Sequence, residues 1–326
     1  MIRVALTETR NAFAPMPASV DELEAALASR LADIRSANLR HNEALIRRAA
    51  ARGARIVGLG ELCTAPYFAL AQQAFWRDLA EPAATGPSCK YFSAIARELG
   101  VVIVAPIYEL DAASDRRYDT ALVIDADGSL LGAFRKLHIP HGANETAAFS
   151  ERFYYGPSDT NTLPVFDTSV GCRVGVAICY DRHFEGVVGG LARAGAQLVL
   201  VPAVTFGSQS RRMWALEAPV EACRHRVFVG SSNRKGKEAP WNVNYFGESY
   251  FCGPEGTVAP LVAAEGSGGG GGGVASDLDR CLVIADLDLA SLHDADSSGW
   301  NLARDRRPLP ADAQDGGGGG GQSAST

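Results

Sequence analysis

A cysteine stands at the junction of a predicted strand and a predicted helix, where a nucleophile could be held rigidly. The apolar residues between 174 and 178 predict a buried strand that ends at Cys179. Apolar residues between 187 and 192 recur at helical spacing, and Gly195 is typical of a helix end. Unpaired N–H groups at such a bend can lower the pKa of a thiol and hold an oxyanion. Cysteine is also among the most buried residue types, so this position alone fits an inert core thiol as well.

Two further reactive side chains follow predicted strands in the same way. Glu61 comes after the apolar run RIVGLG, and Lys136 comes after the run LLGAFR. In layered α/β folds, groups at the carboxyl ends of strands collect at one rim, where ligands bind. Each residue alone fits an ordinary surface position. Together with Cys179 they supply a base, a cation and a thiol.

The elements that must position these groups alternate along the chain. Helical patterns cover residues 20 to 52, 88 to 98 and 211 to 225, in addition to the helix after Cys179. The turn DADG joins two strands of a hairpin, and a second hairpin is expected over residues 245 to 260, with its turn in GPEGT. Strands alternating with helices imply layers of sheet covered by helices. Strands are expected at residues 2–7, 55–59, 101–108, 121–124, 130–134, 174–178, 198–201, 227–231 and 281–287.

Composition limits the class of protein and its partners. The 326 residues are 47% hydrophobic, which is enough for a sizeable core. A net charge of −6 argues against nucleic acid or an acidic membrane as the main partner. The seven cysteines are scattered and contain no C-x-x-C pair, which favours a reduced, cytoplasmic protein. The N-terminus lacks the apolar core of a signal peptide, and no segment is long and apolar enough to span a membrane, so we expect a soluble chain.

Two glycine runs stand out, at residues 266 to 273 and 316 to 321. A phosphate-binding loop would need a preceding strand, a following helix and an ordered motif, and none of these is present. The runs are therefore interpreted as a flexible insertion and as part of a disordered tail. The predicted organisation is one domain over residues 1–310, followed by a glycine-rich tail over residues 311–326.

Several motifs along the chain are distinctive: RKLHIP at 135–140, FSE at 149–151, FYY at 153–155, residues 175 to 181, NEALIRRAAARGARIVGLGEL, SSNRKGKE and GESYFCGPEGTV. Together they resemble the nitrilase superfamily of carbon–nitrogen hydrolases, with the closest similarity to the β-ureidopropionase and N-carbamoyl amide hydrolase branch. The Lys and Cys motifs are the most specific. The resemblance covers nearly the whole chain, up to LVIADLDLASL and the DRRP at residues 305 to 308.

The resemblance implies an α/β fold, a four-layer α-β-β-α sandwich of the nitrilase type. It implies a triad of Glu61, Lys136 and Cys179, with Glu151 as a second glutamate that orients Lys136. Glu61 would take the thiol proton, while Lys136 and the Tyr180 N–H would bind the oxyanion. Ammonia or an amine would leave, and a covalent acyl-enzyme would then be hydrolysed. The resemblance also implies a small-molecule substrate, no cofactor or metal, and a homodimer or larger homo-oligomer.

The implied substrate is an N-carbamoyl amine or amino acid, as in β-ureidopropionase. The resemblance assigns substrate binding to Arg182, His183 and Asn233. A guanidinium at position 182 suits a substrate carboxylate, but Arg182 could instead pair with Asp181 or a neighbouring carboxylate. The alternatives within the superfamily are an N-carbamoylputrescine amidase, an aliphatic amidase and a nitrilase.

Two positions depart from the superfamily pattern. Gly60 replaces the proline that usually precedes the base, which could loosen the backbone of Glu61. Glu185 replaces a proline after the nucleophile, and a glutamate is also favoured in the first turn of a helix. These departures keep open an inactive relative that acts as a binding or scaffold protein.

Two other chemistries remain open on the residues alone. His183 or His138 could serve as the base of a Cys–His enzyme, although no orienting third group is evident. His138 and His141 could bind a metal with His183 or Glu61, although the spacing is a weak signal.

Overall fold

The structure is a computed structural model that describes residues 1–262, 277–293, 299–300 and 302–307. The glycine-rich insertion at 266–273 and the tail at 311–326 lie outside the described residues. Among the described residues, no helix combines the length and apolar character that crossing a bilayer requires.

The first sheet has six strands in the order β15-β1-β2-β3-β4-β5. Strands β1, β2 and β3 are parallel, β15 pairs antiparallel to β1, and β3, β4 and β5 form antiparallel neighbours. The predicted DADG turn joins β4 to β5. The strand bounds are β1 (Ile2–Thr7), β2 (Ile56–Gly58), β3 (Val102–Asp111), β4 (Arg116–Ile124), β5 (Leu130–Arg135) and β15 (Leu282–Leu287).

The second sheet has five strands in the order β14-β11-β10-β9-β8. Strands β9, β10 and β11 are parallel, and the outer strands β8 and β14 are antiparallel to their neighbours. The strand bounds are β8 (Val165–Asp167), β9 (Arg173–Val176), β10 (Leu198–Ala203), β11 (Phe228–Asn233) and β14 (Tyr250–Cys252).

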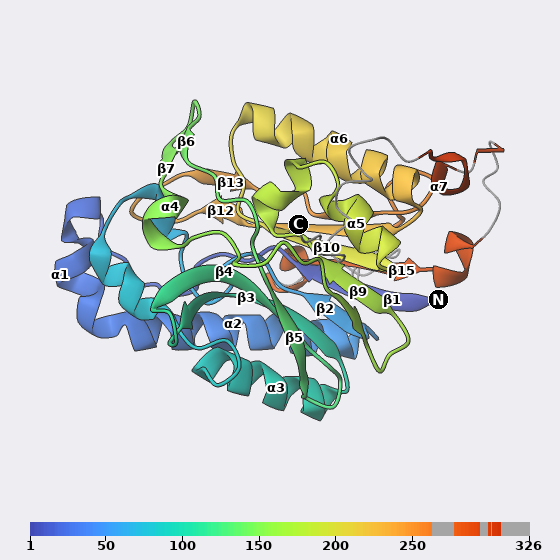
Figure 1. The fold of residues 1–326 in the computed structure, drawn as a ribbon. Coiled ribbons are helices and arrows are strands. Elements are labelled where there is room, and N and C mark those ends of the chain that lie inside the picture. Colours follow the sequence, from blue (N-terminus) through green and yellow to red (C-terminus); the bar gives the residue numbers. More distant parts are fainter. Residues whose placement is uncertain (263–276, 294–298, 301, 308–326) are drawn as a thin grey trace, which may run out of the picture.

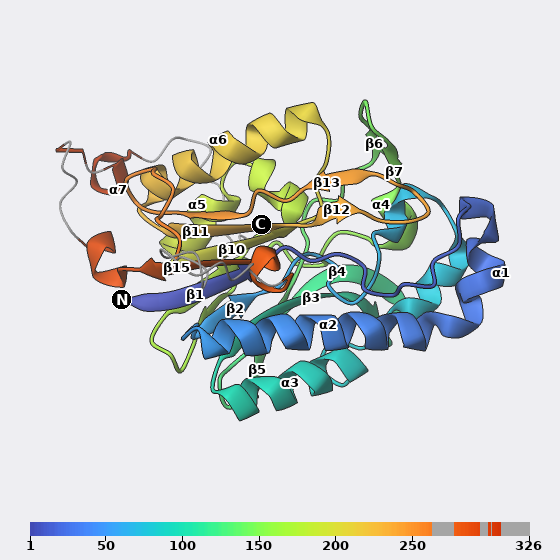
Figure 2. The ribbon, with the colours of Figure 1, turned by 180° about the vertical axis from the view of Figure 1, so that it is seen from behind.

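The two sheets pack face to face, with helices on both outer faces (Figures 1 and 2). Helices α2 (Leu31–Ala51) and α3 (Pro87–Leu99) cover the first sheet, and α5 (Val187–Arg193) and α6 (Ser208–His225) cover the second. Alternation in β1 explains the layers, because Val4 and Leu6 lie in the core between the sheets while Ala5 joins the core under α2 and α3. The predicted α-β-β-α sandwich is confirmed.

Short elements gather at the end of the sandwich that carries the reactive groups. They include α1 (Leu23–Leu27), α4 (Glu151–Tyr154), and the two-stranded ribbons β6 (Gly142–Ala143) with β7 (Ala148–Phe149) and β12 (Lys235–Lys237) with β13 (Asn244–Phe246). Helix α7 (Leu302–Asp305) lies near the carboxyl end of the chain. Further 3-10 turns span Val20–Glu22, Ala28–Arg30, Phe68–Leu70, Ala74–Leu79, Cys179–His183, Asp279–Cys281 and Leu289–Leu292.

The hairpin predicted over residues 245–260 is divided into two. Strand β13 pairs with β12, whereas β14 turns back so that Cys252 bridges Val258. Gly247 and Glu248 both have left-handed backbone conformations, with φ of 66° and 56°. Two such residues cannot continue a strand, so β13 pairs with β12 in a two-stranded ribbon while β14 belongs to the second sheet.

Candidate active site

Glu61, Lys136 and Cys179 meet at one buried place between the two sheets. Glu61 follows β2, Lys136 directly follows β5, and Cys179 lies three residues after β9. Glu61 and Lys136 are fully buried, whereas Cys179 keeps 6% of its surface exposed. Cys179 is therefore the least enclosed of the three residues, although it is buried as well.

Lys136 is the centre of the cluster. Its Nζ lies 2.7 Å from Glu61 Oε1 and 2.7 Å from Glu151 Oε2. Burial alone would lower the pKa of Lys136, but Glu151 and Glu61 raise it well above its usual range, so the side chain is an ammonium ion. A fixed ammonium in a water-poor site can stabilise negative charge that develops on a substrate oxygen.

Glu61 is ionised, and both of its carboxylate oxygens accept hydrogen bonds. Its Oε2 accepts a hydrogen bond from the Val204 N–H. Burial would raise the pKa of Glu61, but Lys136, together with hydrogen bonds that include the Cys179 thiol, holds it below its usual range. The Cys179 thiol donates to the carbonyl of Val204, the residue whose N–H binds Glu61. An ionised carboxylate beside the thiol is placed to receive the thiol proton.

The backbone that carries Glu61 is fixed by a buried arginine. Arg234 donates to the carbonyl oxygens of Glu61 and Leu62, and a buried ion pair with Glu238 balances its charge. Leu62 has a left-handed φ of 49°, so this turn is strained and needs such support. At Gly60, a Cβ atom would lie 2.4 Å from Thr9 Oγ1, so the missing side chain lets the loop pack closely.

Cys179 has a strained backbone, with φ of 49°. It begins the 3-10 turn Cys179–His183, and the Tyr180 N–H lies in its first turn, where N–H groups lack helical partners. The prediction that this position lowers the thiol pKa is wrong. Burial and the Glu61 carboxylate raise the pKa of Cys179 more than Lys136 and Arg182 lower it, so the resting group is a neutral thiol.

Glu151 joins the cluster from α4. Its Oε2 binds Lys136, and its Oε1 accepts a 2.7 Å hydrogen bond from the Tyr67 hydroxyl. Burial and Glu61 raise the pKa of Glu151, while Lys136 opposes that rise. Tyr67 was not singled out in the sequence, because nothing near it marks a buried tyrosine as a partner of a glutamate 84 residues away.

Asp181 is a second group that sequence reasoning missed. Its carboxylate accepts hydrogen bonds from the N–H groups of Ile178 at 3.2 Å and His138 at 2.9 Å, and it contacts His138 Nδ1 at 2.8 Å. It therefore ties the loop after Lys136 to the loop that holds Cys179. The feature of the sequence that could have indicated this role is the position of Asp181 two residues after Cys179.

Arg182, His183 and Asn233 lie close to the cluster but already have internal partners. Arg182 binds Glu217 at 3.1 Å and donates to the Cys179 carbonyl at 2.7 Å, so the ion-pair alternative describes its resting state, with Glu217 as the carboxylate. His183 Nδ1 also binds Glu217. The Asn233 side chain bonds the backbone of Thr205 at both its N–H (3.0 Å) and its carbonyl (3.3 Å).

The two rival chemistries find little support in this geometry. Nδ1 of His138 binds Asp181 and Nδ1 of His183 binds Glu217, which would orient either ring. Among the described residues, however, the hydrogen-bond partners of the Cys179 sulfur are the Val204 carbonyl and Arg182, and neither histidine contacts it. In the part of the chain that the structure describes, no group of three or more His, Cys, Asp or Glu side chains is arranged to hold a metal ion.

A thiol, an ionised carboxylate and an ammonium between two sheets form the arrangement of a thiol-dependent hydrolase. The sequence model for carbon–nitrogen hydrolases matches residues 27–296. This chain belongs to the carbon–nitrogen hydrolase family.

Known relatives agree with this assignment. An N-carbamoylputrescine amidase from Oryza sativa subsp. japonica is 32% identical over 85% of this chain and 88% of its own length. A beta-ureidopropionase from Arabidopsis thaliana is 32% identical over 75% of this chain and 59% of its own length. The crystal structure of Saccharomyces cerevisiae Nit3, a nitrilase superfamily member, superposes with a TM-score of 0.67 at 23% identity, covering 90% of this chain and 92% of Nit3. The nitrilase-type fold predicted from the motifs is confirmed.

Proposed function

We propose that this chain hydrolyses the C–N bond of an N-carbamoyl amine or amino acid, with Cys179 as the nucleophile. The observation that carries the proposal is the contact of one ammonium, Lys136, with two buried glutamates beside a thiol. The thiol donates to the carbonyl of Val204, whose N–H binds Glu61. The relatives named above act on N-carbamoyl compounds by their names, which supports this substrate class.

In the proposed reaction, the Cys179 sulfur bonds the carbamoyl carbon while its proton moves to Glu61. Lys136 and the Tyr180 N–H bind the oxyanion. Collapse of the intermediate breaks the C–N bond, and Glu61 returns the proton to the leaving nitrogen as ammonia or the amine departs. Water then attacks the acyl-enzyme, again with Glu61 as the base. Because the resting thiol is neutral, we infer that proton transfer accompanies the attack of sulfur on carbon.

The remaining site residues have distinct proposed roles. Glu151, supported by the Tyr67 hydroxyl, holds Lys136 in place. Asn233 fixes the backbone at Thr205, next to the Val204 N–H that binds Glu61, so it shapes the substrate site by positioning. We place His183 at the same end of the site, where it shares Glu217 with Arg182.

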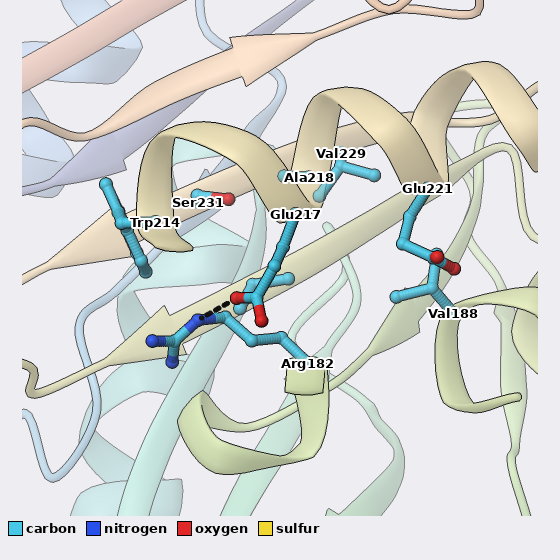
Figure 3. A pocket seen from close by; sticks show the side chains of 9 residues that line it. Arg182, Val188, Trp214, Glu217, Ala218, Glu221, Val229 and Ser231 are labelled. Atoms are coloured by element: carbon cyan, nitrogen blue, oxygen red, sulfur yellow. Dashed lines mark hydrogen bonds and ion pairs between the residues drawn. The ribbon is translucent and has the colours of Figure 1, made fainter. Parts of the chain in front are cut away.

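The Arg182–Glu217 pair favours a second candidate, an N-carbamoyl amine without a carboxylate, such as N-carbamoylputrescine. Figure 3 shows the Arg182 guanidinium turned toward Glu217 of α6, with Glu221 further along the same helix. A guanidinium already neutralised by a carboxylate attracts a substrate carboxylate less strongly. N-carbamoyl-β-alanine would have to compete with Glu217 for Arg182.

Release of Arg182 by Glu217→Gln is expected to shift the substrate preference. In an ammonia-release assay, we expect the ratio of kcat/KM for N-carbamoyl-β-alanine to kcat/KM for N-carbamoylputrescine to rise about fivefold, because about 1 kcal/mol of charge pairing corresponds to that factor. Glu221→Gln is the matched control, because Glu221 lies on the same helix and pairs with His225 and Arg224 instead. An unchanged ratio in Glu217→Gln would remove Arg182 from substrate selection.

We also propose that the chain works as a homodimer or larger homo-oligomer in the cytoplasm. Helix α6 exposes Leu216 (54%) and Val220 (49%), and Phe184 next to α5 is partly exposed, so the outer helical layer offers an apolar surface. Light scattering is expected to give at least twice the 34.4 kDa chain mass. A monomer at micromolar concentration would contradict the proposed assembly.

A further inference from the structure

A third buried acid, Asp119, faces Lys136 in addition to Glu61 and Glu151, and it lies in β4. It pairs with Tyr108 of β3, and its carbonyl accepts the Lys136 N–H at 2.9 Å. The side chain is fully buried, and neither carboxyl oxygen accepts a hydrogen bond from a donor among the described residues. In the described part of the chain, the cation that pairs with it is Lys136, whose Nζ lies 3.5 Å from Oδ2. An ionised carboxylate left in this state would be costly.

The charges around Asp119 do not balance if it is ionised. Lys136 already neutralises part of the charge on Glu61 and Glu151, so a third carboxylate would leave the buried cluster with two excess negative charges. Burial and the facing Glu61 carboxylate raise the pKa of Asp119 well above its usual range, against the effect of Lys136. The titratable and charged groups that face Asp119 are Glu61, Lys136, Glu151, Tyr155, Cys63 and, across the strand pair, Tyr108.

We propose that Asp119 is a neutral carboxylic acid whose O–H donates a hydrogen bond to Glu61, and that it thereby positions Glu61 as the base of the reaction proposed above. Asp119 is a positioning residue, because it acts on the substrate only through Glu61. No proton leaves Asp119 during turnover.

The hydrogen bonds of Glu61 explain why such a donor is needed. A carboxylate has about four acceptor sites on its two oxygens. Lys136 Nζ and the Val204 N–H occupy two of them, and the neighbouring Cys179 thiol and a protonated Asp119 can supply the other two. With every site filled, Glu61 stays ionised and cannot rotate, so the thiol is the one donor whose proton is transferred when sulfur attacks.

The protonation of Asp119 gives the proposal a stability test that needs no substrate. A carboxyl group with a raised pKa in the folded state favours folding fully below its unfolded pKa of about 3.9, and this contribution is lost as the pH rises toward the folded pKa. Asp119→Asn keeps the shape and a donor without this loss. We expect its melting temperature to exceed that of the wild type at pH 7, with a gap that widens from pH 5 to pH 9.

Kinetics supply the second readout. Asp119→Asn is expected to keep kcat/KM at pH 7 within about threefold, because an amide also donates to Glu61. We expect it to move the alkaline decline of kcat/KM, where the wild-type Asp119 loses its proton, to higher pH. Asp119→Leu fills a similar volume without a donor, and we expect it to lower kcat about tenfold or more, with a smaller change in KM.

Asp125→Asn is the matched control, since Asp125 lies on the hairpin turn after the same strand and binds Ser169 away from the site. Asp125→Asn should leave the alkaline decline of kcat/KM at the wild-type pH. The difference between its melting temperature and that of the wild type should not change with pH. If Asp119→Asn melts below the wild type at neutral pH, and this difference in melting temperature disappears in acid, Asp119 is ionised in the wild type. That result would overturn the proposal. Equal losses of activity in Asp119→Asn and Asp119→Leu would also overturn it. Failure of the proposed hydrolysis leaves the melting comparison intact, so the two failures are distinguishable.

Discussion

Cys179→Ala is expected to abolish ammonia release, with kcat lowered about 10⁵-fold or more, because loss of the nucleophile removes the covalent route altogether. The rest of the cluster remains in place, since Lys136 keeps both glutamate partners. Steady-state ammonia release measures the loss, and circular dichroism melting checks that the fold survives.

Cys172→Ala is the matched control for this variant. Cys172 is also a buried free cysteine, but it lies before β9 and outside the cluster. We expect it to keep wild-type kcat within about threefold despite a modest loss of core packing. Residual activity of a few per cent in folded Cys179→Ala would mean that another group attacks the substrate.

Glu61→Gln is expected to lower kcat by about 10²- to 10⁴-fold with little change in KM, which is the range that a lost general base produces. The amide has nearly the shape of the carboxylate but cannot accept the thiol proton. Its NH₂ group would also face the Lys136 ammonium, or the Val204 N–H, where the carboxylate now accepts a hydrogen bond. Stopped-flow or discontinuous ammonia assays over pH 4–9 measure the effect.

The pH dependence of the wild type follows from the same carboxylate. Because the pKa of Glu61 lies below its usual range, the base stays ionised through mild acid, and activity is lost only as the pH falls through that lowered value. Glu81→Gln is a suitable control, because Glu81 is a buried glutamate that binds Ser88 outside the cluster. A normal rate in Glu61→Gln would assign the base to another residue.

The positions of Glu61, Lys136 and Cys179 after predicted strands could be read from the sequence, because strand patterns are local. Glu61, Lys136 and Cys179 each follow an apolar run by at most a few residues, so the rule that strand ends meet at one rim applied to all three. The strand expected at residues 2–7 is also present as β1, and Val4 and Ala5 lie on its opposite faces.

What the sequence did not reveal depends on partners that are far apart in the chain. Asp119 lies in the polar first half of β4, before the strand expected at residues 121–124, and its role depends on Glu61 and Lys136. Arg182 finds Glu217 on a helix 35 residues away. The neutral state of Cys179 results from burial and the nearby Glu61 carboxylate, and no local pattern encodes either.

The most direct measurement for the central claim is intact-protein and peptide mass spectrometry of the enzyme after rapid acid quenching during turnover of N-carbamoylputrescine or N-carbamoyl-β-alanine. We expect one added acyl group on the peptide that contains Cys179, with the mass of the substrate less the departed ammonia or amine. This adduct should be absent in Cys179→Ala. Full turnover without any adduct on Cys179, or an adduct on another residue, would contradict it.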